Sequence, residues 1–436
     1  MKLNTKRTLL VGLAFLSISA FWQLYDSVVP LVLKNTFDIP DDIAGFIMAL
    51  DNVLALFLLP LFGKLSDNCS TRLGKRTPFI LCGTVAAVVL MQLLPYADNT
   101  GNMVLFVCTL GLLLLAMGTY RSPAVALMPD VTPKPLRSKG NAIINLMGAL
   151  GGVFTLAMIS LLVTKDAAGR EHYSTLFAAV GALMVIAVTV LLLTIRENKL
   201  VAETDAINEQ LTRDKPEVPE QADAGKGGFK ALPKDLRRSL ILILCSVSLW
   251  FMGYNAVTTA VTKYMSVQWG YDIKAASQCV MVATVAAVIS YIPIGSLSAR
   301  FGRKRMIQSG VTVLALSFAT AALFTTFHPS VYIIFSLVGI AWSMINVNSY
   351  PMVVEISKAS EVGKFTGYYY TFSMAAQIAT PILSGWLLEH VGYHTLFPYA
   401  ALMVAASFVT ISLTKHGDSR PEKPKSKLEA FDAGDD

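Results

Sequence analysis

Charged residues are scarce in this sequence. Only 15% of its 436 residues are Asp, Glu, Lys or Arg, whereas 54% are hydrophobic. A chain with so little charge cannot cover a water-facing surface with polar side chains, which disfavours a soluble globular protein. The composition is instead typical of a protein that crosses a membrane many times.

Residues that build catalytic or metal sites are also few. The five cysteines are an odd number, and all but Cys69 lie in apolar runs, so they predict neither a disulfide framework nor a metal site. The sequence contains no constellation of a nucleophile with its base, so an enzyme is not expected. A buried histidine proton relay is not expected either, because the five histidines lie at predicted helix ends or loops: His172, His328, His390, His394 and His416.

Long apolar runs dominate what remains. Twelve are long enough to span a membrane, and six lie on each side of one polar segment. We therefore predict an all-α membrane protein, with twelve transmembrane helices in two pseudo-symmetric six-helix bundles. The expected domains are a bundle over 1–195, a cytoplasmic linker over 196–238, a second bundle over 239–414 and a disordered tail over 415–436. The runs are 9–33, 43–63, 79–97, 103–128, 141–164, 174–195, 239–264, 274–299, 306–327, 331–356, 364–388 and 394–414.

The distribution of Lys and Arg predicts the orientation. With the N-terminus inside, 30 of the 36 Lys and Arg residues fall in cytoplasmic segments and 5 in outer turns. Because positive charge is retained on the cytoplasmic side, both termini are expected in the cytoplasm, as in a multi-pass protein of the cell membrane. The net charge of +7 then belongs to the inner surface, where its partner is anionic lipid rather than nucleic acid.

The second half of the chain repeats the first. Duplicated transporters bind their substrate near the membrane midplane, where the two repeats meet. Four landmarks recur here at near-constant offsets of 225 to 232 residues: Tyr25-Asp26 with Tyr254-Asn255, Gly63 with Gly295, Asp130 with Glu355, and Gly140 with Gly367.

Three charged residues interrupt the apolar runs of the first half: Asp26, Asp51 and Arg121. A guanidinium in hydrocarbon costs about 3 to 15 kcal/mol, so Arg121 should face an interior path and have an acidic partner. The three charges sum to minus one. The carboxylate left over would bind a proton or a sodium ion, as a symporter requires. The alternative is a fixed triad that only holds helices together.

Amide and aromatic side chains line the predicted spans of both halves. Amides satisfy hydroxyl groups, and ring faces stack on the C–H face of a pyranose, so the set fits a neutral sugar. Each member could equally join neighbouring helices. The predicted substrate-binding residues are Trp22, Tyr25, Asn52, Asn145, Trp250, Tyr254, Asn255, Trp342, Asn346, Asn348 and Gln377.

The loop after the span 43–63 reads GKLSDNCSTRLGKRTPF, with Gly63, Asp67 and Gly74. It resembles the inner-loop signature of the major facilitator superfamily, G-x-L-x-D-x-x-G-R-K, lengthened between the aspartate and the second glycine. Together with RSPAVALMPD at 121–130, it is similar to the prokaryotic relatives of plant sucrose/proton symporters, the glycoside-cation symporter type. The plant proteins have their arginine at the position of Val125, one turn after Arg121.

The resemblance implies a monomeric carrier that takes up a disaccharide or glucoside, such as sucrose or maltose, by alternating access. The co-transported cation is expected to be a proton, with sodium as the alternative. A drug or organic-solute exporter or exchanger, and a non-transporting receptor, remain open. Gating contacts at the inner face are expected from Asp67, Lys75, Arg76, Asp130, Arg137, Arg303 and Glu355.

Overall fold

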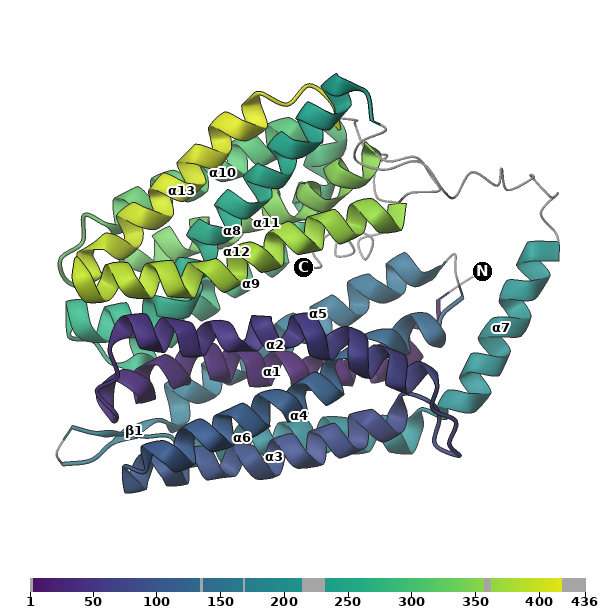
Figure 1. Ribbon diagram of the computed structural model, residues 1–436, viewed down its shortest axis with the longest axis horizontal. Coiled ribbons are helices and arrows are strands. Elements are labelled where there is room, and N and C mark those ends of the chain that lie inside the picture. Colours follow the sequence, from purple (N-terminus) through teal and green to yellow (C-terminus); the bar gives the residue numbers. More distant parts are fainter. Residues whose placement is uncertain (1–2, 134–135, 168, 214–231, 357–361, 418–436) are drawn as a thin grey trace. The chain divides into compact units, whose positions relative to one another are not determined.

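Helices make up almost all of the regular structure in the computed structural model, which describes residues 3–133, 136–167, 169–213, 232–356 and 362–417 (Figure 1). The elements are α1 (Thr5–Asn35), α2 (Asp41–Asp67), α3 (Thr77–Thr100), α4 (Met103–Asp130), α5 (Arg137–Leu162), β1 (Thr164–Lys165), β2 (Glu171–His172), α6 (Ser174–Thr194), α7 (Glu197–Arg213), α8 (Lys234–Trp269), α9 (Ile273–Phe301), α10 (Arg303–Ala321), α11 (Val331–Glu355), α12 (Val362–His390), η4 (Tyr393–Thr395) and α13 (Leu396–Ser412).

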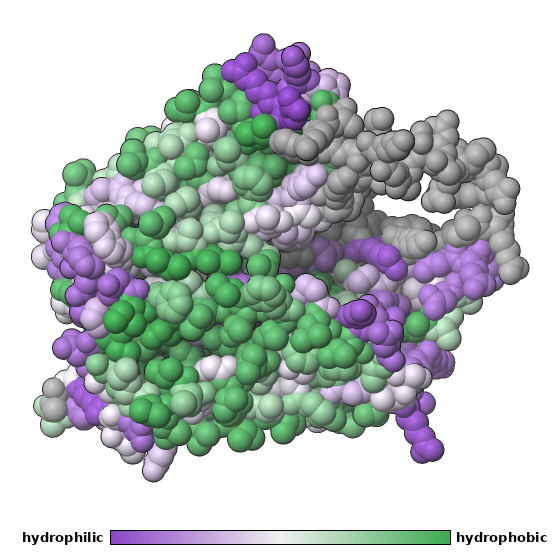
Figure 2. Space-filling model, viewed as in Figure 1, coloured by the Kyte–Doolittle hydropathy of each residue, from purple (hydrophilic) through white to green (hydrophobic). Residues whose placement is uncertain are grey.

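The predicted all-α fold is confirmed. Helices α1 to α6 and α8 to α13 overlap the twelve predicted runs one for one. Among the described residues, ten segments are long and apolar enough to cross a membrane, and α10 and α12 do not meet that criterion. Large apolar side chains are exposed along the helices, for example Leu193 at 80% and Val104 at 73%. Figure 2 shows hydrophobic residues over the middle of the visible face and hydrophilic residues mostly toward its ends.

Polar residues between the apolar runs begin and end the helices. Gly101 has a φ of +64°, which favours glycine, and it closes α3. The side chain of Asn102 then accepts the backbone N–H of Leu105 and begins α4. An antiparallel hairpin connects α5 to α6 and was not predicted. Its strands, β1 and β2, have two residues each.

The chain forms two compact units. The first consists of Met1–Ile39, Leu50–Pro216 and Asp272–Met281, and the second of Pro40–Ala49, Glu217–Tyr271 and Val282–Asp436. In the first, α1 packs on α5 and α6, and α3 packs on α4 and α6. In the second, α8 packs on α12 and α13, and α10 packs on α11 and α13. The four helix pairings of one unit thus recur in the other, as the sequence offsets suggest.

A glycine permits the close approach of α1 and α5 within the first unit. A Cβ atom on Gly151 would lie 2.0 Å from the carbonyl oxygen of Leu16, so no larger residue fits there. Such contacts let membrane helices approach at backbone distance and gain packing energy along their length. The helix that carries Trp22, Tyr25 and Asp26 is therefore firmly held against α5.

Two expectations concern the polar segments. The helix α7 occupies the start of the predicted linker, whereas residues 214–231 lie outside the described residues. The predicted disordered tail lies outside them from residue 418 onward. Lys263 lies within α8, near the end of the predicted run 239–264, and is only 4% exposed. The helix α8 continues beyond that run to Trp269.

Candidate functional site

A cluster of charged and aromatic side chains lies inside the first unit. Helix α1 presents Trp22, Tyr25 and Asp26 at helical spacing, α2 contributes Asp51, and α4 contributes Arg121. The guanidinium carbon of Arg121 lies 5.5 Å from the ring centroid of Trp22, a cation–π contact. The Trp22 ring meets Tyr25 edge-on at 5.5 Å. Three helices thus bring the predicted coupling residues together.

The charges of this cluster interact without direct pairing. Arg121 interacts electrostatically with both Asp26 and Asp51, and the two carboxylates with each other. Among the described residues, no ion pair within 4.0 Å joins Arg121 to either carboxylate. The side chain of Asn52 donates to Asp51 Oδ1 at 2.7 Å. One guanidinium therefore serves two carboxylates, and a proton on either of them would neutralise the cluster.

Several polar atoms around this cluster are buried without a hydrogen-bond partner among the described residues. They are Nε1 of Trp22, the hydroxyl of Tyr25, and both amide atoms of Asn145 on α5. Leaving such a group unpaired costs about 1 to 3 kcal/mol, so native proteins supply a partner from water or a ligand. Polar groups on α1 and α5 are thus available to bind a solute.

The second unit holds an aromatic cluster at the corresponding helices. The rings of Tyr254 on α8 and Trp342 on α11 are stacked, with centroids 3.7 Å apart and an interplanar angle of 5°. Phe251 meets Trp342 edge-on at 5.3 Å. Nε1 of Trp250 and the side-chain nitrogen of Asn255 are buried without a hydrogen-bond partner among the described residues. This unit therefore also combines ring faces with unused hydrogen-bond donors.

The remaining predicted substrate residues differ in their surroundings. Asn348 is 1% exposed and donates to the carbonyl of Met344 in its own helix at 2.9 Å, a contact that stabilises α11. Asn346 is buried at 5% exposure, and Gln377 on α12 is half-buried. Of these three, Gln377 has the most accessible side chain.

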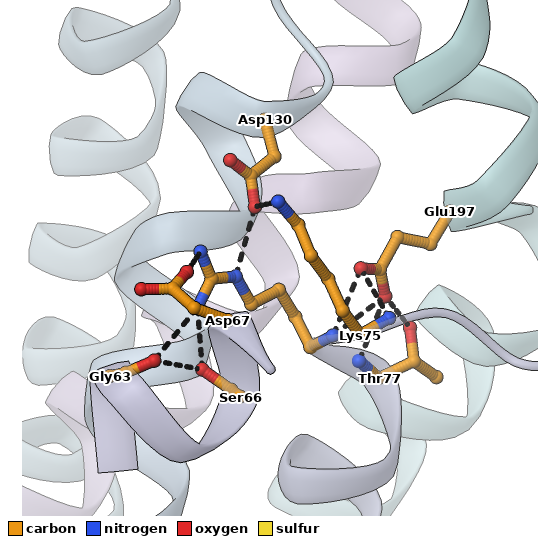
Figure 3. A network of polar contacts seen from close by, with 8 residues as sticks. Gly63, Ser66, Asp67, Lys75, Thr77, Asp130 and Glu197 are labelled. Carbon is orange, nitrogen blue, oxygen red and sulfur yellow. Dashed lines mark hydrogen bonds and ion pairs between the residues drawn. The ribbon is translucent and has the colours of Figure 1, made fainter. Parts of the chain in front are cut away.

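A second polar network lies where α2 ends and α3 begins, and Arg76 is at its centre. Figure 3 shows the labelled residues of this network. The Arg76 side chain is 6% exposed and forms ion pairs with Asp67 and with Asp130, the latter at 2.9 Å. It also donates to Ser66 and to the carbonyl of Gly63. Arg76 thereby joins the ends of α2 and α4 to the start of α3.

The other predicted gating residues lie nearby or in the second unit. Lys75 Nζ lies 3.2 Å from Asp130 Oδ2. Arg137 Nε donates to the carbonyl of Thr132 at 3.3 Å, within the loop before α5. In the second unit, Arg303 at the start of α10 forms an ion pair with Glu355 at the end of α11. The repeat thus preserves a basic residue paired with the acid at the end of the corresponding helix.

Glu197, the first residue of α7, was not among the predicted site residues. Its buried carboxylate, 1% exposed as a residue, accepts the backbone N–H groups of Lys75, Arg76 and Thr77, each at 2.9 Å, and the hydroxyl of Thr77 at 2.7 Å. Gly74 has a φ of +126°, and a Cβ there would lie 2.1 Å from Glu197 Oε2. The one available signal was the start of α3, which has no capping side chain of its own.

A buried ion pair in the second unit was also missed. Lys263 Nζ lies 2.7 Å from Asp41 Oδ1, and the two side chains are 5% and 0% exposed. The backbone N–H of Asp41 donates to Glu389 Oε2 at 2.7 Å. The ammonium also lies 6.0 Å from the ring centroid of Tyr393. These contacts connect the beginning of α2 with α8 and the end of α12.

Comparison with known proteins identifies the family. The family model for the Major Facilitator Superfamily matches residues 11–290 and 263–433, which together cover most of the chain. The chain belongs to the Major Facilitator Superfamily. It is therefore a multi-pass secondary transporter of this superfamily and not an enzyme.

Curated superfamily relatives match parts of the chain. The human proton-associated sugar transporter A is 30% identical over 155 residues, which are 33% of this chain and 20% of that protein. The sucrose transport protein SUC3 of Arabidopsis thaliana is 26% identical over 151 residues, 30% of this chain and 25% of that protein. The chain thus spans about a fifth to a quarter of the length of these relatives. An uncharacterized transporter of the superfamily from Methanocaldococcus jannaschii is 22% identical, and 83% of each chain is covered.

Solved structures confirm the predicted major facilitator fold. A crystal structure of a D-xylose-proton symporter matches with a TM-score of 0.67 at 15% identity, over 95% of this chain and 98% of that chain. The nucleoside transporter NupG matches with a TM-score of 0.66 at 14% identity, over 94% and 99% of the two chains. At such low identity the likeness shows the fold alone.

Proposed function

We propose that this transporter takes up a neutral disaccharide or glucoside together with a proton, by alternating access. The observation that carries the proposal is a cluster of charges on the membrane helices α1, α2 and α4. In this cluster Asp26 and Asp51 both interact with the single guanidinium of Arg121. The partial similarity to proton-associated sugar and sucrose transporters supports it.

The charge balance of the cluster supports proton coupling. Two ionised carboxylates and one guanidinium leave one negative charge inside a membrane protein, where an uncompensated charge is costly. Binding one proton at Asp26 or Asp51 removes that charge. Loading the proton thus changes the electrostatic energy of α1, α2 and α4 together, which can bias a two-state equilibrium of the carrier.

The unpaired polar groups support a polyhydroxy substrate. Trp22, Tyr25 and Asn145 in the first unit offer both donors and acceptors, and Trp250 and Asn255 in the second offer donors. A sugar hydroxyl both donates and accepts, so it can satisfy either kind of group. A charged substrate would instead require more countercharge than one arginine supplies.

The two bundles and the polar networks at the helix ends have different roles in the proposed transport. Two bundles, 1–195 and 239–414, alternate access to the sugar, and the cytoplasmic side carries both termini and the linker. The networks around Arg76 and around the pair of Arg303 with Glu355 regulate that movement without touching the sugar. The domain boundaries and the orientation rest on the distribution of apolar and basic residues.

Uptake by purified protein in proteoliposomes tests the function. We expect a labelled disaccharide or glucoside to accumulate only when an inward proton gradient is imposed, and a protonophore to abolish the accumulation. If accumulation instead requires a sodium gradient, the co-transported cation is sodium and not a proton. The same assay is run with a panel of labelled disaccharides and glucosides. If none of them shows counterflow and the protein instead exports a drug or organic ion, the proposal is overturned in favour of an exporter.

A further inference from the structure

A basic cavity in the first unit shares no lining residue with the Arg121 cluster or the Arg76 network. It has a volume of about 410 Å³ and is formed by the beginning of α1, the end of α6 and the beginning of α7. Its lining includes four cations, Lys6, Arg7, Arg196 and Lys199, and one acid, Glu203. The charged groups therefore leave an excess of three positive charges around one space.

The existing ion pairs use only part of this charge. Glu203 lies 3.8 Å from Arg7 and 3.9 Å from Lys199, and it is the acid that both cations share. Among the described residues, neither Lys6 nor Arg196 forms an ion pair or side-chain hydrogen bond. Both are exposed, so their charges are available to an anionic ligand that enters the cavity.

Apolar surface adjoins the basic cavity. Leu10, Ile195 and Leu200 belong to its lining. Leu9 and Leu193, next in the chain to lining residues, are 39% and 80% exposed on helices that cross the membrane. A ligand with an anionic head and apolar tails matches this arrangement of basic residues beside apolar ones. Its head would lie among the cations and its tails along α1 and α6.

We propose that this cavity binds the phosphate headgroup of an anionic phospholipid, whose acyl chains follow the exposed leucines. The bound lipid connects α1, α6 and α7 and adds to the contact between Arg7 and Glu203. The proposal concerns the membrane environment and is independent of the solute that the carrier transports.

Native mass spectrometry and vesicle reconstitution test the lipid site. The probes are phosphatidylglycerol and phosphatidylcholine, and the test variant is the double substitution Lys6→Gln/Arg196→Gln. The matched control, Arg238→Gln/Arg305→Gln, removes two exposed arginines from α8 and α10 of the other unit. We expect the test variant to lose phosphatidylglycerol binding at least about tenfold, because each basic residue near an anionic lipid contributes to its affinity. The control and the wild type should bind alike.

A second variant distinguishes lipid binding from a loss of folding. Glu203→Gln removes the one acid of the cavity and should raise phosphatidylglycerol binding about threefold, since an exposed pair of this kind is weak. The proposal is overturned if the test and control variants lose phosphatidylglycerol binding equally. It is also overturned if the wild type binds phosphatidylcholine as well as phosphatidylglycerol, or if Glu203→Gln does not raise phosphatidylglycerol binding. Complete displacement of the lipid by excess inorganic phosphate would identify a free-phosphate site and overturn it as well.

Discussion

The backbone nitrogen of Arg76 lies 2.9 Å from Oε1 of Glu197, a carboxylate that lies 121 residues farther along the chain. The same carboxylate accepts the backbone N–H groups on either side, so it caps the start of α3. The cap fixes the backbone from which the Arg76 side chain reaches Asp67 and Asp130. The helix α7 is therefore part of the polar network around Arg76.

Removing this cap should destabilise the protein. Glu197→Ala leaves three N–H groups without their acceptor and should lower the free energy of unfolding by about 2 kcal/mol. Glu197→Gln keeps one acceptor oxygen and should cost less. The measurement is the thermal unfolding of purified protein in mild detergent, with the exposed Glu209→Ala on the same helix as the control. Equal midpoints for Glu197→Ala and Glu209→Ala would show that the cap contributes nothing.

The ion pair of Asp67 with Arg76 should influence the conformational equilibrium rather than folding. The Asp67 side chain is 59% exposed, so its contact is worth about 1 kcal/mol, enough to shift two populations about fivefold. We expect Asp67→Asn to raise accessibility from the cytoplasm and to slow net uptake. Ala299→Asp, at the matching position of the second half, should change accessibility little or favour the outward-open state. An inward-facing cysteine reporter that reacts equally in wild type and Asp67→Asn would refute a gating role.

The buried pair of Lys263 with Asp41 predicts a large effect of removing one partner. Lys263→Met leaves the Asp41 carboxylate, 0% exposed, without its countercharge and should destabilise by about 3 to 5 kcal/mol. The double variant Asp41→Asn/Lys263→Met removes both charges and should recover most of that loss. Thermal unfolding of both variants is compared with Lys274→Met as the control. A double variant as unstable as Lys263→Met would contradict the role of the stranded charge.

The sequence predicted the architecture well because each membrane helix is encoded locally, by an apolar run of sufficient length. The sequence also predicted that Asp26, Asp51 and Arg121 lie near one another, because charges within such runs must face an interior. The cap by Glu197 was not predictable in this way, because its partners lie about 120 residues away. The pair of Asp41 with Lys263 was missed for a similar reason: both residues lie at the ends of their apolar runs, where a charge usually faces water.

The proposed orientation predicts which residues a membrane-impermeant thiol reagent can reach. In a background with the five native cysteines replaced by serine, Thr100→Cys should react in intact cells, because this exposed residue lies in the predicted outer turn. Glu209→Cys on α7 should react only after the membrane is permeabilised. Labelling in the opposite order would reverse the orientation.

The carboxylates of Asp26 and Asp51 interact with Arg121 and are the proposed carriers of the transported proton. If one of them carries the proton, then Asp51→Asn or Asp26→Asn should abolish sugar uptake driven by a proton gradient. Exchange of internal for external sugar needs no net proton movement, so it should remain in part. Because Asn52 donates to Asp51 and Asp26 forms no hydrogen bond among the described residues, the two substitutions should differ in how much exchange they retain.

The matched control for this experiment is Asp235→Asn, which removes an exposed carboxylate at the start of α8. It should leave both uptake and exchange unchanged. Parallel loss of uptake and exchange in Asp26→Asn and Asp51→Asn would assign these residues to sugar binding or folding, and a thermal unfolding measurement would separate those two causes. Unchanged concentrative uptake in both variants would refute coupling through this cluster, because removal of either negative charge leaves Arg121 with a single carboxylate and no site for the transported proton.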